Sequence, residues 1–158
     1  MRKQFAELVH DAMLKNDDIY VITGDLGYGL WDKIRDSFPK RFFNVGSSEM
    51  AMMGMGIGLA MDGKIPFVYS ITPFTIYRPF EMIRNYLEHE KIAVNIIGSG
   101  RDRDYGYLGF SHWAEEDKQI IGCFKNIKMY HPETDIELKS NFKNIIDNRI
   151  PTYLNLKK

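Results

Sequence analysis

Two spacings of apolar residues alternate along the chain. Between residues 4 and 15, apolar side chains recur every three or four positions, which predicts a helix with one apolar face. Residues 19–22 form a short continuous apolar run, which indicates a strand that is covered on both sides. The alternation continues and predicts helices over 31–38, 48–61, 78–89, 113–121 and 134–148, and strands over 42–45, 65–69, 92–97, 127–130 and 152–156.

This alternation predicts a doubly wound α/β fold, with a mainly parallel sheet of about six strands and helices on both faces. In such sheets, ligands bind outside the carboxyl ends of the strands. The segments 24–30, 70–77 and 98–111 follow strands, so we expect them to be loops that form the walls of a site. No repeat, low-complexity tract or linker divides the sequence, and we expect a single domain over residues 1–158.

Charge and cysteine content narrow the classes of function. Twenty-one Lys and Arg residues balance twenty-one Asp and Glu residues, so nothing indicates binding to nucleic acid or to an anionic membrane. No apolar run approaches the roughly 18 residues of a membrane span. The single cysteine, Cys123, and an N-terminal segment without the apolar core of a signal peptide favour a cytoplasmic protein. Ten Phe, nine Tyr and nine Met residues lead us to expect an apolar interface with another subunit.

One charged residue stands out in the segment 42–61. Glu49 is the only charged side chain there, among apolar, small and weakly polar residues. Burying an unpaired carboxylate costs several kcal/mol unless it is hydrogen-bonded or protonated. Glu49 therefore needs a partner, which is either an arginine such as Arg41 or Arg78, or a bound ligand.

Several familiar motifs are absent. The sequence has no phosphate-binding loop, nucleophile elbow or HExxH motif, and no Cys/His cluster with zinc spacing, so we predict no metal site within the chain. The run Gly54-Met-Gly56-Ile-Gly58 lies inside a predicted helix, and its spacing does not fit the dinucleotide fingerprint. Because glycine disfavours a helix interior, we expect the backbone of this helix to lie very close to a neighbouring element.

Residues 41–67 read RFFNVGSSEMAMMGMGIGLAMDGKIPF. This segment resembles the pyrimidine-binding domain of the transketolase family of thiamine diphosphate enzymes. That family has a phenylalanine-asparagine-x-glycine stretch, a glutamate that opens a helix rich in glycine and alanine, and a glycine turn before a strand that begins at proline. The upstream stretch GDLGYG and the downstream stretches RPFEMIRN and GFSH resemble further family motifs in the same order, so that the resemblance covers roughly residues 3–156.

The resemblance implies roles for residues near the cofactor. Glu49 would donate a hydrogen bond to a ring nitrogen of the aminopyrimidine, favouring an imino tautomer that takes the proton from carbon 2 of the thiazolium, after which the cofactor does the chemistry. Phe74 would stack against the aminopyrimidine, with Ile71 and Tyr77 as further wall residues, although the stretch before Phe74 is one residue longer than in the family. Asp25 would lie beside the cofactor at a subunit boundary. Ordinary core packing is the alternative for the three wall residues, and a turn or helix cap is the alternative for Asp25.

The resemblance also points to residues near the substrate. His112 would hydrogen-bond to substrate oxygens or transfer protons to them, with Ser111 beside it. The family has proline, threonine and glutamine where this chain has Phe110, Ser111 and Trp113, so we expect a different substrate preference.

Two arginines in the same loop are further candidates. Arg101 and Arg103 could hold a phosphate or carboxylate group of the substrate. The alternative is a solvated charge cluster with Asp102 and Asp104.

Half of the expected cofactor site is missing from the sequence. The family binds the diphosphate through a magnesium ion in a separate domain, which is marked by a glycine-aspartate-glycine motif and a downstream asparagine, and this sequence has neither. The diphosphate-binding domain and the carboxyl-terminal domain are both expected to be absent. The resemblance thus implies a separately encoded diphosphate-binding subunit that holds Mg²⁺, in an α2β2 heterotetramer with thiamine diphosphate across the subunit boundary. Alone, the chain should dimerise, aggregate or bind the cofactor weakly.

The function that follows is transfer of a two-carbon ketol unit between carbonyl or sugar substrates, active only with the partner. A beta-type subunit of a 2-oxo acid dehydrogenase and a decarboxylase or carboligase subunit are the alternative enzymes. A non-catalytic scaffold or regulator is the alternative of another class. A flavodoxin-like nucleotide module would need a phosphate loop where the acidic stretch GDLGYG stands. The donor and the acceptor remain open.

Overall fold

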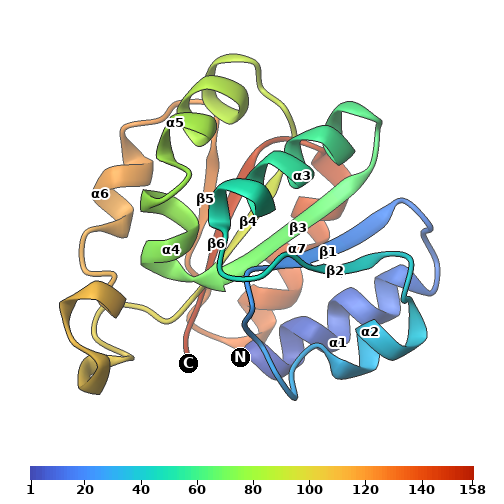
Figure 1. Cartoon of the computed structure of the whole chain (residues 1–158), viewed down its shortest axis with the longest axis horizontal. Helices are drawn as coiled ribbons and strands as arrows, with labels where there is room; N and C mark the ends of the chain where they lie inside the picture. Colours follow the sequence, from blue (N-terminus) through green and yellow to red (C-terminus); the bar gives the residue numbers. More distant parts are fainter.

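The apolar runs of the sequence form one parallel sheet. The computed structural model describes residues 1–158, and its six strands lie in the order β2-β1-β3-β4-β6-β5, with every neighbouring pair parallel (Figure 1). The predicted doubly wound α/β fold is confirmed. The strands are β1 (Ile19–Thr23), β2 (Phe42–Asn44), β3 (Ile65–Ile71), β4 (Asn95–Ser99), β5 (Lys128–Tyr130) and β6 (Thr152–Leu156).

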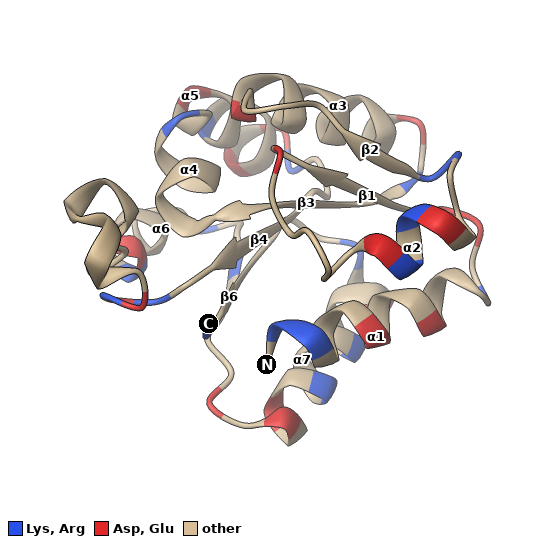
Figure 2. Ribbon diagram, turned by 60° about the horizontal axis from the view of Figure 1, so that its bottom comes forward, with Lys and Arg blue, Asp and Glu red and all other residues tan.

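Helices cover both faces of this sheet. On one side lie α1, α2 and α7, and on the other lie α3, α4, α5, the π-helical segment η1 and α6 (Figure 2). Lys, Arg, Asp and Glu lie mostly on the helices and loops, with both signs mixed. The helices are α1 (Arg2–Met13), α2 (Asp32–Ser37), α3 (Glu49–Met61), α4 (Thr72–Tyr77), α5 (Phe80–Met82), η1 (Ile83–His89), α6 (Asp117–Gly122) and α7 (Asp135–Asn148), with 3₁₀ turns η2 (Gly106–Leu108) and η3 (Phe110–His112).

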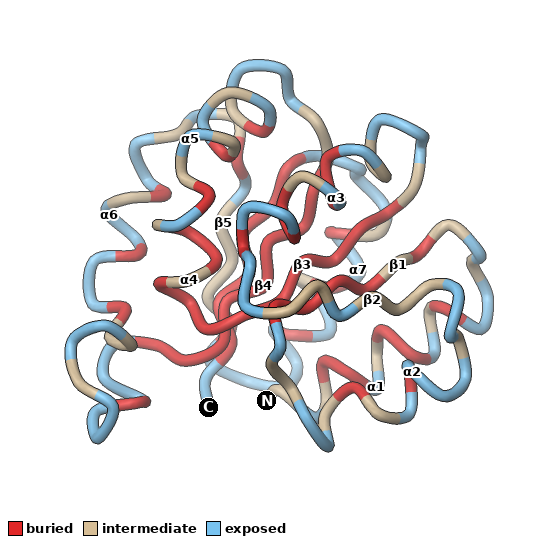
Figure 3. The backbone as a smooth tube through the Cα atoms, in the orientation of Figure 1, coloured by how far each residue is buried: buried red, intermediate tan, exposed pale blue.

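The two faces of the sheet carry separate apolar cores, and the central strands are buried between them (Figure 3). Under α1 and α7, the ring of Phe5 meets Trp31, Phe67 and Phe142 edge to face, with ring centres 5.8–6.2 Å apart. The opposite core gathers methionine and branched aliphatic side chains from α3, η1 and the strands. Burial on both faces explains why the strands read as continuous apolar runs. No helix in the structure is both long and apolar enough to cross a membrane.

The largest differences between the predicted and the observed elements lie in three segments, while the strand predicted over 92–97 runs from Asn95 to Ser99. Residues 70–77 were expected to form a loop, but Thr72–Tyr77 form α4, because Pro73 falls at the start of the helix, where its missing N–H leaves no hydrogen bond unmade. The helix expected over 113–121 begins only at Asp117, because Ala114 donates a backbone hydrogen bond to Asp102 in an isolated bridge. The segment expected as one helix over 78–89 divides into α5 and η1.

The predicted close approach of α3 is confirmed at Gly56. A Cβ atom on Gly56 would lie 2.7 Å from Val68 Cγ1 on β3 and 3.4 Å from Val94 Cγ1. The helix therefore packs against the sheet at a distance that only glycine permits. Gly58 is different, because a Cβ atom there would meet nothing within 4 Å.

These two glycines should respond oppositely to alanine. We expect Gly56→Ala to lower the free energy of unfolding by about 1–3 kcal/mol through overpacking against Val68. Gly58→Ala should raise it by up to about 1 kcal/mol, because alanine favours the helix and has room there. Urea denaturation of both variants would measure the difference. Equal effects of the two substitutions would contradict the close approach.

Candidate active site at the carboxyl edge of the sheet

The predicted site residues follow the carboxyl ends of different strands. Asp25 comes after β1, Glu49 opens α3 after β2, Phe74 lies in α4 after β3, and His112 ends η3 in the loop after β4. Because all strands are parallel, these four positions lie at one edge of the sheet. The path from β2 into α3 runs along this edge in Figure 1.

Glu49 is buried, as its apolar surroundings in the sequence predict. Only 3 % of its surface is exposed, and its Oε2 accepts a hydrogen bond of 2.7 Å from Nη1 of Arg78. Its Oε1 faces the backbone of Gly24, where a Cβ atom would lie 3.5 Å away. Of the two arginines considered as partners, Arg78 is therefore the one observed. Arg41 donates instead to the carbonyl oxygens of Met13 and Asn16.

Arg78 connects Glu49 to the predicted aromatic residue. The guanidinium carbon of Arg78 lies 3.8 Å from the centre of the Phe74 ring. The two residues are four positions apart, at the end of a helix whose conformation continues through Arg78, so both side chains project from the same side. Phe74 also meets the imidazole of His112 edge to face, with ring centres 4.9 Å apart. The structure thus brings Glu49, Phe74 and His112 together through a chain of contacts.

A glycine and a serine shape the turn that carries His112. Gly109 begins the turn with φ +82°, a conformation that glycine adopts without strain. The hydroxyl of Ser111 lies 3.0 Å from Nδ1 of His112, within hydrogen-bonding distance. Phe110, which stands where the family motif has proline, is 84 % exposed.

Asp25 lies at the outer rim of this edge. Its backbone has φ +59°, and its N–H donates to Oδ1 of Asn44. Its carboxylate accepts hydrogen bonds from the Tyr28 hydroxyl at 2.6 Å and from the Asn44 amide at 3.2 Å. These bonds, chiefly the one from Tyr28, lower the pKa of Asp25 below its ordinary value. The sequence marks Asn44 only as part of the phenylalanine-asparagine-x-glycine stretch, and its bonds to Asp25 become visible in the structure.

The two other wall candidates are not part of this chain of contacts. No hydrogen bond or ring contact joins Ile71 or Tyr77 to Glu49, Phe74 or His112. Ile71 lines a cavity of about 210 Å³ whose other walls include Tyr69 and Tyr105. The Tyr77 hydroxyl is buried without a hydrogen-bond partner, and burial, followed by the charge of Glu116, raises its pKa.

The two loop arginines lie in different environments. Arg101 is 6 % exposed, and its guanidinium donates to the carbonyl oxygens of Asn155 and Pro132 and to the carboxylate of Glu133. Arg103 is exposed, donates to Glu115 and stacks over the ring of Trp113. Neither contacts Glu49 or Phe74. The guanidinium of Arg101 ties the loop after β4 to the ends of β5 and β6, which is a structural position.

Arg101 and Arg103 form a matched pair for a stability experiment. We expect Arg101→Met to lower the free energy of unfolding by about 2–3 kcal/mol, because it leaves the buried carbonyl oxygens of Asn155 and Pro132 without their donors. Arg103→Met should change it by about 1 kcal/mol or less, since its ion pair and ring contact are exposed. Chemical denaturation measures both values. A small effect at Arg101 would mean that the loop is held by other contacts.

The structure also contains a buried polar cluster that the sequence did not reveal. The carboxylate of Asp117 accepts hydrogen bonds from the hydroxyl of Tyr153 at 2.6 Å, from the amide of Asn155, and from Nε2 of His131 at 3.0 Å. Tyr153 and Asn155 are two residues apart on β6 and therefore share a face of the sheet. No spacing motif marks these residues, because they come from three separate segments.

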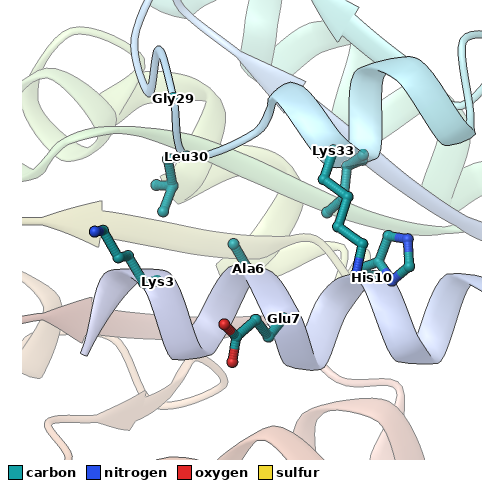
Figure 4. A pocket seen from close by; sticks show the side chains of 8 residues that line it. Lys3, Ala6, Glu7, His10, Gly29, Leu30 and Lys33 are labelled. Carbon is teal, nitrogen blue, oxygen red and sulfur yellow. The ribbon is translucent and has the colours of Figure 1, made fainter.

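A hollow elsewhere on the surface contains none of the predicted residues. It lies between α1 and residues 29–34, has a volume of about 270 Å³, and is drawn in Figure 4. Its charged lining comes from Lys3, Glu7 and Lys33, with His10 beside them. We therefore place the candidate site at the carboxyl edge and not in this hollow.

The chain is thus a doubly wound α/β domain with a buried carboxylate, an aromatic ring and a histidine gathered at the carboxyl edge of its sheet, where domains of this class bind ligands. Within that class, residues 1–158 match the sequence profile of the family described as "Transketolase, pyrimidine binding domain". The chain belongs to this family, and the resemblance found in the sequence is confirmed.

Curated relatives extend the match over nearly the whole chain. The "Putative transketolase C-terminal section" of Methanocaldococcus jannaschii is 32% identical over 157 residues, which cover 99% of this chain and 50% of the relative. The "6-deoxy-6-sulfo-D-fructose transketolase subunit" of a Clostridium species is 27% identical, with 99% of this chain and 49% of the relative covered. The chain thus spans about half the length of these relatives.

Solved structures agree with the fold. A structure described as "Split gene transketolase, inactive beta4 tetramer" has a TM-score of 0.86 and 28% sequence identity, and the match covers 99% of this chain and 50% of that one. Transketolase from Leishmania mexicana has a TM-score of 0.88 at 19% identity, with 99% of this chain and 25% of that chain covered. The second comparison supports the fold alone.

Proposed function

We propose that this chain is the pyrimidine-binding subunit of a two-subunit, thiamine diphosphate-dependent transketolase. Such an enzyme transfers a two-carbon ketol unit between carbonyl or sugar substrates. The observation that carries the proposal is the buried Glu49 at the start of α3, joined through Arg78 to Phe74, in a chain of the transketolase pyrimidine-binding family.

The residues present fit the pyrimidine half of this cofactor. Glu49 offers a carboxyl group in a buried position, and Phe74 offers an aromatic face close to it. The Phe74 ring already stacks against a flat, nitrogen-containing group, the guanidinium of Arg78. Gly24 leaves the space beside Glu49 Oε1 free of a side chain. When bound, thiamine diphosphate supplies the electron sink for breaking and forming the carbon–carbon bond.

Each residue then has a role of its own. Glu49 holds the proton that it donates to a ring nitrogen of the aminopyrimidine, and Phe74 supports the ring by stacking. His112, oriented by Ser111, hydrogen-bonds to substrate oxygens or exchanges protons with them. Asp25, at the rim, faces the subunit boundary. Magnesium and the diphosphate belong to the partner subunit in this proposal, and the chain has no cluster of three or more His, Cys, Asp or Glu side chains that could hold a metal ion.

Two further observations support a partner subunit. Large apolar side chains are exposed in the loops after β1 and β4, namely Tyr28, Tyr107, Leu108 and Phe110. Exposed aromatic residues around a site are typical of a surface that another protein covers. Relatives are named as a transketolase "C-terminal section" and as one subunit of an apulose-4-phosphate transketolase, and the β-only tetramer of one split-gene transketolase is described as inactive. An α2β2 assembly satisfies these observations.

The proposal is tested by titrating thiamine diphosphate with Mg²⁺ into the chain, into a diphosphate-binding partner, and into their mixture. The partner is a protein with the glycine-aspartate-glycine motif and the downstream asparagine that this chain lacks. We expect calorimetry to detect tight binding only in the mixture, with an affinity at least about tenfold higher than that of either protein alone. No binding in the mixture would leave the family assignment standing and would favour a non-catalytic scaffold.

A further inference from the structure

Arg78 makes two contacts with the candidate site at once. Its Nη1 donates to Oε2 of Glu49 at 2.7 Å, while the centre of its guanidinium lies 3.8 Å from the centre of the Phe74 ring. Among the hydrogen bonds, ion pairs and ring contacts of the chain, no other side chain reaches both residues. At 3.8 Å the guanidinium rests directly on the ring, so no second flat group can enter between them.

These are the two contacts that the proposed function assigns to the aminopyrimidine ring. Guanidinium and aminopyrimidine are both flat and rich in nitrogen, and both can stack on an aromatic face while bonding to a carboxyl group. We propose that Arg78 occupies the place of the aminopyrimidine in the cofactor-free chain, and that the cofactor binds by displacing it. This inference rests on the proposed function and names the residue that must move before that function begins.

The two states of the site also differ in the direction of the hydrogen bond at Glu49 Oε2. An arginine side chain has only donors, so Glu49 accepts a hydrogen bond in the present arrangement. The proposed role requires the same carboxyl group to donate a hydrogen bond instead. Glu49 therefore cannot donate from Oε2 while Arg78 is bound to that oxygen.

The position of Arg78 allows it to leave. It lies at the C-terminal end of α4 and 46 % of its side chain is exposed, so rotation of the side chain alone can carry the guanidinium into water. Glu49 is the only side chain to which Arg78 is hydrogen-bonded. While Arg78 remains bound, its charge pairs with the buried carboxylate of Glu49, which would otherwise cost several kcal/mol as an unpaired charge. Arg78 thus stabilises the empty site and is replaced when the ring arrives.

A binding experiment on the full chain tests the displacement. The probe is the pyrimidine half of thiamine, 4-amino-5-hydroxymethyl-2-methylpyrimidine, titrated into the wild type, Arg78→Met and the control Arg84→Met. Arg84 is exposed and bonds only to the adjacent Asn85, so its replacement leaves the site intact. We expect Arg78→Met to bind the probe about tenfold more tightly than the wild type, and Arg84→Met to bind it equally. Equal or weaker binding by Arg78→Met would overturn the inference.

A second measurement uses the wild type and does not depend on the folding of a variant. In the free chain, the Nε–H resonance of Arg78 should be shifted by the ring of Phe74, and Phe74→Leu should abolish that shift and so assign the signal. Saturation with the probe should move the wild-type resonance to the position of an exposed arginine. Binding that leaves the resonance unchanged would overturn the displacement while leaving the proposed function intact. A last outcome combines two experiments: neither the wild type nor Arg78→Met binds the probe, and the mixture with the partner does not bind thiamine diphosphate. In that case the proposed function fails, and the inference fails with it.

Discussion

Glu49→Gln is expected to reduce the turnover of the assembled enzyme by about a thousandfold, within the range of about 10²–10⁴ that a proton-transferring group contributes. A glutamine amide keeps the size of the side chain and can still accept a hydrogen bond from Arg78, so the fold should persist. It cannot give a carboxyl proton to the aminopyrimidine. The measurement is the kcat for ketol transfer by the reconstituted complex, at saturating thiamine diphosphate and Mg²⁺.

The matched control is Glu81→Gln, which changes an exposed glutamate on α5. It should leave turnover within about twofold of the wild type, because surface substitutions away from a site change little. Circular dichroism should show both variants folded. Retention of more than about a tenth of the activity by Glu49→Gln would place cofactor activation on another residue, although the family membership would be unaffected.

Asp117→Ala should have the largest effect on stability. The carboxylate accepts three hydrogen bonds from buried or nearly buried donors on Tyr153, Asn155 and His131. Its removal takes the acceptor from the Tyr153 hydroxyl and the His131 imidazole, and leaves the Asn155 amide only its bond to the Tyr153 hydroxyl. We expect the free energy of unfolding to fall by about 3–5 kcal/mol. Asp147→Ala on α7 is the control, since its ion pair with Lys143 is exposed and should contribute about 1 kcal/mol or less. Denaturation with urea measures both, and similar effects would mean that water replaces the lost carboxylate.

The carboxylate of Asp117 should also make the free energy of unfolding depend on pH. Burial alone would raise the pKa of Asp117, but hydrogen bonds from His131, Tyr153 and Asn155, together with the charge of His131, hold the pKa below its ordinary value. A carboxyl with a lowered pKa in the folded chain stabilises it above the unfolded pKa of about 3.9, and this contribution is lost as the pH falls through the folded pKa. Between about pH 5 and pH 3, the wild type should therefore lose stability more steeply than Asp117→Asn. Parallel losses would contradict the shift.

The sequence predicted the fold well wherever an element buries a continuous or periodic apolar face. The strand over 152–156 and the helix that opens at Glu49 agree with the structure, because each is marked by its own residues. The loop expected over 70–77 was wrong, and the error concealed a contact. Only the helical spacing of α4 places Phe74 and Arg78 on one side, so their stacking could not be foreseen from a loop.

The remaining differences arise from contacts between distant segments. Glu49 was identified because a lone charge in an apolar segment is visible in one stretch of sequence. The burial of Arg101 was not visible, because its acceptors include the backbone carbonyl oxygens of Pro132 and Asn155, which no residue type marks. Asp117 was missed for a similar reason, since its three donors become neighbours only when β5, β6 and α6 are assembled.

The strand order has a consequence for how the chain reaches its native state. The last strand in the sequence, β6, fills the space between β4 and β5, where Asn95 pairs with Thr152 and Lys128 pairs with the same residue. No two strands of this sheet can form a hairpin, so every pairing must close a long loop, which slows folding. Until β6 is made and inserted, β4 presents an unpaired apolar edge to other chains. During synthesis, aggregation of the nascent chain should therefore compete with folding until β6 leaves the ribosome.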